Sequence, residues 1–334
     1  MLSGVPDWCS VFLGWQEVEV EVEVKVEGEV EVEEEVEVEE EVEVEVEVEV
    51  EEEVEVEVEE EREANGKPAI SYLCRLMQAP PLTITFLGTG TSGGVPMVAC
   101  DCEVCRSEDP KDKRLRSSIM VESETTRIIV DATPDFRQQL LRENVKRLDA
   151  LLITHSHKDH IGGIDDTRAL QYAQRTPTKI YSDKHGLQGV YNEVPYAFGP
   201  KKYPGVPELE LHEMDMQPFR IGDIPIQPIE VWHHRMPVLA FRFGHFAYIT
   251  DANRIEPEEM EKLQGLKLLV VNALRREPHI SHFTLQQAID LAKALKVESA
   301  FFTHISHQLG KHAEVNAELP PNIRLAWDGL KIGV

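Results

Sequence analysis

The chain has no run of about 20 apolar residues, the length that a membrane-spanning helix needs, and residues 1–14 lack the basic start and long apolar core of a secretory signal. We therefore expect a cytoplasmic protein with no membrane partner. Cysteine is also scarce, because the chain has five, and three of them lie within six positions. That spacing suits a reducing compartment and a metal site better than a disulfide framework.

Positive charge is scarce as well, with 34 Lys and Arg against 61 Asp and Glu. Most of the imbalance belongs to residues 1–76, which hold 28 acidic and 4 basic residues, whereas the other 258 residues hold 33 and 30. That remainder is nearly neutral and has no basic arm between Lys179 and Gln227. Nucleic acid is therefore disfavoured as a partner.

Residues 1–80 form a low-complexity extension, in which Glu and Val alternate almost strictly from Glu17 to Glu63. Such alternation nominally indicates a strand, but neighbouring glutamates on one face repel each other and a single ribbon of valines has nothing to pack against. We expect disorder there. Alternatively, the segment is a mis-called start, with translation beginning at Met77, or an acidic interaction tail without a supporting motif.

The remaining residues, 81–334, suffice for one large domain. Apolar runs that predict strands are followed by segments that predict helices in both halves, as in residues 268–271 before residues 284–294. This order favours an α/β fold of two sheets packed face to face with helices outside. The last segment, residues 323–332, reads as a closing hairpin around Asp328 and Gly329.

A glycine-rich turn at residues 88–96 follows the first predicted strand, residues 83–87. Such a turn can approach a phosphate closely or can be a plain loop. It lacks the Gly-Lys-Ser/Thr ending of a P-loop, so nucleoside triphosphate hydrolysis is not supported.

The densest group of polar side chains is in residues 154–163, Thr-His-Ser-His-Lys-Asp-His-Ile-Gly-Gly, directly after an apolar run. A core would have to desolvate all of these groups, whereas zinc, manganese and iron take imidazoles and carboxylates as ligands. Alternation places His155 and His157 on one side of an extended segment, and Asp159 and His160 follow before the Gly-Gly turn. One segment can thus serve two adjacent ions.

A second candidate metal site is formed by Cys100, Cys102 and Cys105. Three thiols in six residues can bind one zinc ion, and a fourth ligand from elsewhere in the chain would complete a tetrahedral structural site. The alternative is three independent reduced thiols.

Other ionisable groups stand where predicted strands end, among them Asp131, Asp251, His304 and the pair His233 and His234. Asp131 either orients a metal-bound histidine or caps a turn. His185, His212, His245, His279 and His312 lack any motif, and we interpret them as surface or structural residues.

The His-Ser-His-Lys-Asp-His segment after a strand resembles the signature of the metallo-β-lactamase superfamily of hydrolases. The resemblance implies a four-layer αββα sandwich and two divalent ions, zinc or manganese, in the active site. The implied ligands are His155, His157 and His233 for the first ion, Asp159, His160 and His304 for the second, and Asp251 as the bridge. His233 is preferred to His234 because it directly follows its strand.

Within the superfamily, the cysteine cluster and the His304-x-x-His307 pair resemble the phosphoribosyl cyclic phosphate phosphodiesterases of the carbon-phosphorus lyase pathway. His307 is then the expected fourth ligand of the structural zinc. His282, in Ser-His-Phe-Thr, matches a phosphate-contacting histidine of that branch and of tRNA 3′-processing ribonucleases. Its alternative role is that of a solvated residue before a helix.

These features predict a dinuclear phosphodiesterase that cleaves a small, cyclic or open, phosphate ester with a metal-bridged hydroxide, and with Asp159 and His282 as catalytic residues. The alternatives are an acyl or thioester hydrolase like the glyoxalases, a tRNA 3′-processing nuclease, and a metal-binding module without activity. The sequence leaves the natural substrate and the oligomeric state open, a homodimer included.

Overall fold

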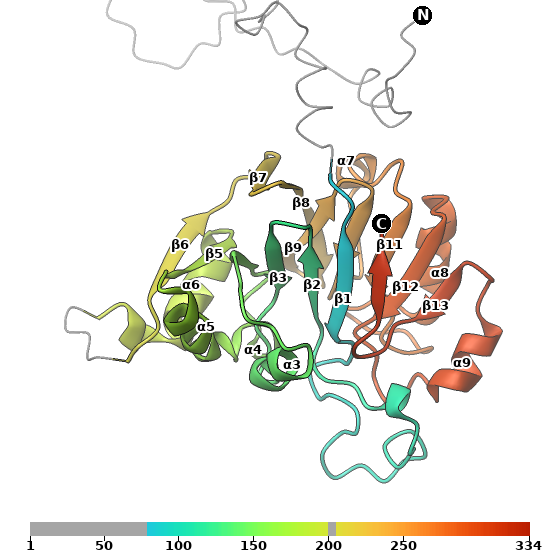
Figure 1. Cartoon of the computed structure of the whole chain (residues 1–334). Coiled ribbons are helices and arrows are strands. Elements are labelled where there is room, and N and C mark those ends of the chain that lie inside the picture. Colours follow the sequence, from blue (N-terminus) through green and yellow to red (C-terminus); the bar gives the residue numbers. More distant parts are fainter. Residues whose placement is uncertain (1–78, 200–204) are drawn as a thin grey trace, which may run out of the picture. The chain divides into compact units, whose positions relative to one another are not determined.

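A computed structural model describes residues 79–199 and 205–334 (Figure 1). The expected disorder of the Glu/Val extension concerns residues that lie almost wholly outside these ranges, as does the suggested start at Met77, so both stay predictions. The same holds for the boundary between the extension and the domain. Within the described ranges, no helix is both long and apolar enough to cross a bilayer.

The described residues form two seven-stranded sheets. The first has the strand order β14-β1-β2-β3-β4-β5-β6. Its strands are β1 (Thr83–Gly88), β2 (Ser118–Glu122), β3 (Arg127–Val130), β4 (Ala150–Leu152), β5 (Thr178–Ser182), β6 (Leu209–Glu213) and β14 (Lys331–Gly333). β1, β2 and β3 are antiparallel, as is β14 to β1, whereas β3 to β6 run parallel.

The second sheet has the order β13-β12-β11-β10-β9-β8-β7. Its strands are β7 (Phe219–Ile221), β8 (Ile224–His233), β9 (Met236–Phe243), β10 (Phe246–Ile249), β11 (Leu268–Asn272), β12 (Ser299–Thr303) and β13 (Ile323–Leu325). β7 to β10 are antiparallel, and β10 to β13 run parallel.

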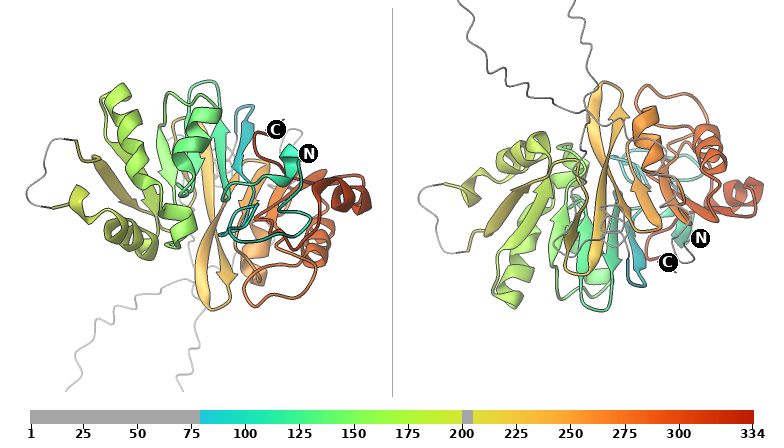
Figure 2. Two further views of the ribbon diagram at one scale, coloured as in Figure 1. Left: turned by 90° about the horizontal axis from the view of Figure 1, so that it is seen from below. Right: turned by 90° about the horizontal axis from the view of Figure 1, so that it is seen from above.

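Helices cover the outer face of each sheet, so the domain has four layers (Figure 2). The helices are α3 (Phe136–Arg142), α4 (Lys158–Ile161), α5 (Thr167–Gln174), α6 (Lys184–Glu193), α7 (Pro257–Glu261), α8 (Leu285–Ala294) and α9 (His312–Glu318), with 3-10 turns at Pro110–Asp112, Ile164–Asp166 and Pro195–Ala197. This is the αββα sandwich that the sequence predicted.

Three apolar cores hold the layers together, and alternation along the strands assigns side chains to them. In β3, Ile128 and Val130 belong to the core between the sheets, whereas Ile129 belongs to the core under the outer helices. In the second sheet, Val270 faces the first sheet and Leu269 the outer helices. Strands buried on both faces read as continuous apolar runs, which explains why sequence patterns located them.

The predicted closing hairpin at residues 323–332 is wrong. β13 pairs with β12 in the second sheet, whereas β14 pairs with β1 in the first sheet. The chain crosses between the sheets through Asp328, whose carboxylate accepts bonds from Thr89 Oγ1 at 2.7 Å and from the Leu115 backbone N–H at 2.8 Å. A partly buried, hydrogen-bonded aspartate therefore lies where a hairpin turn was expected.

Candidate metal centre

The predicted ligands lie at the C-terminal ends of strands from both sheets. His155 follows β4, and Asp159 and His160 lie on α4. His233 ends β8, Asp251 follows β10, and His304 follows β12. Because parallel strands end at one edge of a sheet, residues that are far apart in sequence meet there.

Three aspartate and histidine residues of the candidate site, each next to a strand end, have the left-handed backbone conformation that side chains rarely adopt. φ is +68° at Asp131, +57° at Asp251 and +53° at His304. Such strain persists only where the surrounding structure holds it, and it concentrates at functional sites.

His157 has the extended backbone conformation that the sequence predicted, with φ of −67° and ψ of 147°. His157 is the N-cap of α4, and the helix carries Asp159 and His160, so a helical turn and not the Gly162-Gly163 turn separates the ligands. His157 is exposed, whereas His155 and His160 are buried. The motif thus has a buried side and an open side.

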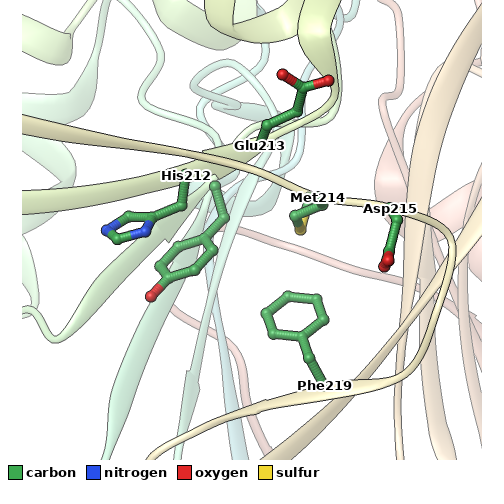
Figure 3. Close-up of a pocket in the computed structure, with 6 residues that line it drawn as sticks. His212, Glu213, Met214, Asp215 and Phe219 are labelled. Atoms are coloured by element: carbon green, nitrogen blue, oxygen red, sulfur yellow. The ribbon is translucent and has the colours of Figure 1, made fainter.

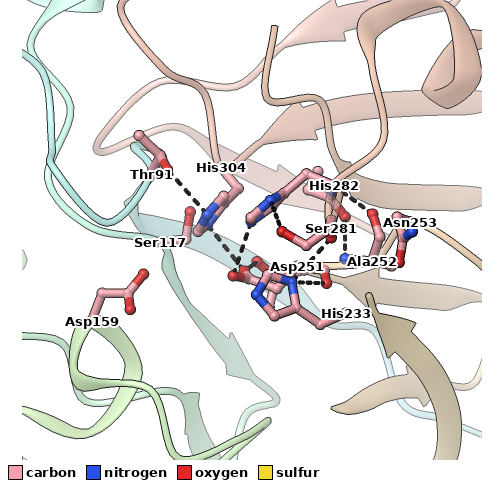
Figure 4. A network of polar contacts seen from close by, with 12 residues as sticks. Thr91, Ser117, Asp159, His233, Asp251, Ala252, Asn253, Ser281, His282 and His304 are labelled. Carbon is pink, nitrogen blue, oxygen red and sulfur yellow. Dashed lines mark hydrogen bonds and ion pairs between the residues drawn. The ribbon is translucent and has the colours of Figure 1, made fainter. Parts of the chain in front are cut away.

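Asp251, the predicted bridging ligand, lies close to His233, His282 and His304 (Figure 4). Its Oδ1 is 3.1 Å from His304 Nδ1 and 3.3 Å from His160 Nε2. Its Oδ2 is 3.3 Å from His282 Nε2 and 3.9 Å from His155 Nε2. One carboxylate therefore faces residues from both proposed ion sites.

The two predicted ligand sets assemble to different degrees. Asp159, His160, Asp251 and His304 have ligand atoms within 4.8 Å of one another. His155, His157 and His233 do not form such a group in the described part of the chain, although their ring centroids are 4.7–5.8 Å apart, close to the 5.9 Å between the rings of His160 and His304.

Of the pair His233 and His234, only His233 faces the cluster. His233 Nδ1 is 2.9 Å from the Asp251 carbonyl oxygen and 3.0 Å from that of Ser281, and its ring faces the cluster. His234 is exposed, with φ of +59°, in the turn between β8 and β9.

Oxygen atoms hold the outward ring nitrogens of the buried histidines. Thr154 Oγ1 is 2.9 Å from His155 Nδ1, and Asp131 Oδ2 is 2.7 Å from His160 Nδ1. Such contacts fix the tautomer and the orientation of a metal-binding imidazole. Asp131 thus has the geometry of an orienting carboxylate rather than that of a turn cap.

Several buried atoms fit a metal ion and have no other partner. His155 Nε2, His160 Nε2 and His304 Nδ1 are buried and make no hydrogen bond, and a buried polar atom without a partner is costly. All three are imidazole nitrogens directed at the Asp251 carboxylate. Imidazole and carboxylate donors suit divalent transition metals, so the residues present fit such ions.

The protonation states of the cluster also favour the binding of a metal ion. Burial lowers the pKa of His155 well below its usual value and that of His304 to about 4, so both rings are neutral, as ligands must be. Burial also acts to lower the pKa of His160, but Asp251, Asp131 and Asp159 outweigh it and raise that pKa. Three carboxylates around one buried ring make a site that favours positive charge.

The cysteine cluster also assembles. Cys100, Cys102, Cys105 and His307 have ligand atoms within 4.8 Å of one another, and His307 Nδ1 is 3.3 Å from Cys100 Sγ and 3.4 Å from Cys102 Sγ. Zinc bonds of ~2.3 Å to sulfur and ~2.0 Å to nitrogen place tetrahedral ligands about 3.5 Å apart. The hydrogen bond from His307 lowers the pKa of Cys102 to about 6, which favours the thiolate.

His282 is buried beside the cluster. The alternative role, a solvated residue before a helix, would have placed it in solvent. Its ring stacks on His304 at 4.9 Å between centroids, and it forms a third close group with His233 and Asp251. On its other side, Nδ1 is 3.0 Å from Ser281 Oγ and 3.1 Å from His279 Nδ1. His279 was interpreted as surface or structural, yet it contacts a candidate catalytic residue.

Several residues for which the sequence predicted no role contact the candidate site residues from outside the histidine motif. Thr91, Ser281 and His279 are examples, and each lies within three residues of a glycine or histidine that the sequence analysis singled out. A hydroxyl next to a candidate site residue is the signal that could have found Thr154, beside His155, and Ser281, beside His282.

A separate cavity of about 620 Å³ is lined by Tyr181, His212, Glu213, Met214, Asp215 and Phe219 (Figure 3). Tyr181 stacks on His212 at 4.5 Å between centroids. None of the predicted ligands lines this cavity.

A four-layer sandwich that carries a histidine and aspartate cluster at its strand ends defines a class of metal-binding enzymes. Residues 126–305, more than half of the chain, match the family described as beta-lactamase superfamily domain. The chain belongs to the metallo-β-lactamase superfamily, whose members include hydrolases that use divalent metals.

Similar proteins carry different names. A crystal structure of a diphosphatase from the PhnP family has a TM-score of 0.72 and 39% identity, covering 76% of this chain and 97% of that one. An octanoyltransferase of Porphyromonas gingivalis is 41% identical over 249 residues, 73% of this chain and 50% of that protein. A ribonuclease Z of Bradyrhizobium diazoefficiens is 34% identical over 83 residues, 24% of this chain and 22% of that protein.

This chain therefore spans about half of the first curated relative and less of the second. The octanoyltransferase is twice as long as the aligned region. Its name therefore does not say what the matching half does.

Proposed function

We propose that the chain is a metal-dependent phosphodiesterase that cleaves a small phosphate ester or diphosphate. The observation that carries the proposal is the position of His282 on the Asp251 side of a complete histidine and aspartate cluster. The likeness to a PhnP-family diphosphatase along 97% of that chain supports the same reaction class.

In this proposal, His155, His157 and His233 hold one divalent ion, Asp159, His160 and His304 hold the second, and Asp251 contacts both. Zinc or manganese ions bound there would polarise a phosphoryl oxygen and lower the pKa of a water molecule. A third ion, zinc, would be held by Cys100, Cys102, Cys105 and His307 and would have a structural role.

In this proposal, Asp251 orients the His282 ring, and His282 protonates an oxygen of the substrate. Asp251 Oδ2 is an acceptor at 3.3 Å, and it keeps the His282 proton on Nε2, the nitrogen that faces the centre. In its imidazolium form, His282 would turn the Nε2–H from Asp251 to the leaving oxygen and give up that proton, while it keeps the proton on Nδ1, the nitrogen that faces Ser281 Oγ. The exposed His157 and the partly exposed Asp159 and His233 mark the side from which a substrate reaches the centre.

Competing chemistries are weaker on the same observations. An acyl or thioester hydrolase gives His282 no phosphoryl group to contact. RNA 3′-processing needs a basic surface, whereas residues 77–334 hold 33 acidic and 30 basic residues.

The test is turnover of the full chain, loaded with zinc or manganese, on a panel of substrates. The panel contains bis-nitrophenyl phosphate, a ribose cyclic phosphate, a 2′,3′-cyclic nucleotide, a diphosphate ester, a precursor tRNA, a lactoyl thioester and a β-lactam. Selective cleavage of the small phosphate esters is expected. Turnover of the thioester or the lactam alone would refute the proposal.

A further inference from the structure

The glycine-rich turn after β1 has no part in the function proposed above, although it reaches the metal centre. Its Thr91 places Oγ1 3.3 Å from His304 Nε2, as Figure 4 shows. The opposite nitrogen of that ring, Nδ1, faces Asp251 Oδ1 at 3.1 Å. His304 therefore lies between a hydroxyl and a carboxylate.

A neutral imidazole carries one N–H and one lone pair, and its neighbours decide which nitrogen has which. If the proton lies on Nε2, the Nε2–H donates a hydrogen bond to Thr91 Oγ1, and the Nδ1 lone pair points into the centre. Without that hydroxyl, the Asp251 carboxylate favours the proton on Nδ1, where it blocks a metal ion. The buried Nδ1 makes no hydrogen bond, which agrees with the first arrangement.

We propose that Thr91 is the positioning residue of His304, and that the glycine-rich turn serves to bring its hydroxyl there. This inference rests on the proposed metal centre, but not on the identity of the substrate.

Hydrogen bonds to neighbouring segments hold the glycine-rich turn in place. The Thr91 N–H donates to the Ile305 carbonyl at 3.1 Å, and the Ile305 N–H donates to the Thr89 carbonyl at 2.9 Å. Arg116 Nε donates to the Ser92 carbonyl at 3.0 Å, and the same guanidinium pairs with Asp135. The turn is thus hydrogen-bonded to Ile305, the residue after His304, and to Arg116, which lies just before β2.

Glycine is required at position 90 by this close approach. A Cβ there would meet the Arg114 carbonyl oxygen at 2.9 Å and the Leu115 carbonyl oxygen at 3.0 Å. Gly90 also bridges Arg116 on one side and Ile305 on the other. The glycine requirement therefore follows from packing against the chain itself.

The other buried histidines of the cluster have the same arrangement. Thr154 holds the outward nitrogen of His155, and Asp131 holds that of His160. Thr91 completes the set for His304 from a segment 213 residues away in sequence. Loss of such a partner typically weakens metal binding about 10- to 100-fold.

The experiment compares Thr91→Val, which has the same shape without the hydroxyl, with Thr91→Ser, which keeps the hydroxyl. Thr125→Val, in the exposed turn between β2 and β3, is the matched control. Metal affinity is measured by chelator competition without substrate, together with the visible spectrum of the cobalt-substituted full chain and KM and kcat on the substrate that turns over.

In Thr91→Val, one of the active-site ions should bind about 10- to 100-fold more weakly, and the cobalt bands should change. Thr91→Ser and Thr125→Val should behave like the wild type. Unchanged metal affinity with a raised KM in Thr91→Val would show a substrate contact and overturn the inference, and so would failure of Thr91→Ser to restore binding. A wild-type chain that binds no active-site ions would instead refute the proposed function.

Discussion

The two candidate metal clusters of this domain are built in different ways. The histidine and aspartate cluster takes its ligands from strand ends of both sheets, and oxygen atoms hold its buried rings. The cysteine cluster takes three ligands from one loop between β1 and β2 and a fourth from His307, with Cys100 and Cys102 partly exposed. One is positioned by the cores, the other by a loop.

From this difference we expect that the fold itself positions the histidine and aspartate cluster, whereas the cysteine loop needs a metal ion to hold its conformation. Strand ends stay in place because the cores on both sides of each sheet hold them, so the first cluster is largely preformed. In the cysteine loop, the side chains of Met97 and Val98 are exposed, and Cys105 is the one buried cysteine of the cluster. For such a loop, the free energy of metal binding becomes free energy of folding.

The largest expected effect is on activity at the preformed cluster. Asp159→Ala removes a partly exposed ligand, and kcat/KM should fall by more than about 100-fold, since loss of an orienting partner alone costs 10- to 100-fold. The thermal unfolding temperature should stay within a few degrees, because no core contact is lost. Steady-state kinetics and a thermal scan measure both, with the exposed Glu258→Ala as the control. A collapse of stability would mean that this cluster also supports the fold.

His282→Ala is expected to come next. Removal of a proton donor should lower kcat about 100-fold, while the metal content, measured by elemental analysis, stays at the wild-type level. This variant sharpens the comparison, because His282 also forms a close group with His233 and Asp251. Loss of one metal equivalent would make His282 a ligand and not a catalytic residue.

At the cysteine cluster the effects should be reversed. Cys102→Ser or His307→Ala should lower the free energy of unfolding by about 2–4 kcal/mol, as loss of a structural metal does, which lowers the unfolding temperature by about 5–15 °C. One zinc equivalent should be lost while some turnover remains. Wild-type thermal stability in both variants would remove the basis for a structural zinc.

The smallest expected effect is on how the free energy of unfolding depends on pH, through His312 beside the cysteine loop. His312 is buried, accepts a bond from Arg114 Nη2 at 3.1 Å, and places its ring edge against Trp327. Burial, with the nearby Arg114 and Lys111, lowers the pKa of His312 to about 4, below the 6.5 of an unfolded chain. The unfolded chain therefore takes up the proton first, and the stabilisation is complete above pH 6.5 and is lost as pH falls toward 4.

His312→Gln keeps an acceptor but does not titrate. Its stability deficit against the wild type should be greatest near pH 7 and should shrink as pH falls from 6.5 to 4, in urea unfolding at several pH values. His185→Gln, at an exposed position, should give a constant difference. A deficit for His312→Gln that does not change with pH would rule out this contribution.

Much of the fold could be predicted from local patterns. Strands buried on both faces read as apolar runs, and the helix α8 has the Thr284 and Gln287 capping box that marks a helix start in sequence. The failure at residues 323–332 has a clear cause, because an Asp-Gly pair indicates a turn but does not say whether the flanking strands pair with each other. Here the partners of β13 and β14 are β12 and β1.

The sequence by itself determined the types of ligand and the spacing within each motif, because a few consecutive residues fix which side chains can reach one ion. Only the tertiary structure decided which histidine of the pair His233 and His234 faces the cluster. It alone showed that Thr91 lies on His304 and that Arg114 lies on His312, contacts across 213 and 198 residues. Such contacts depend on how two sheets and their loops pack, and no local period records that packing.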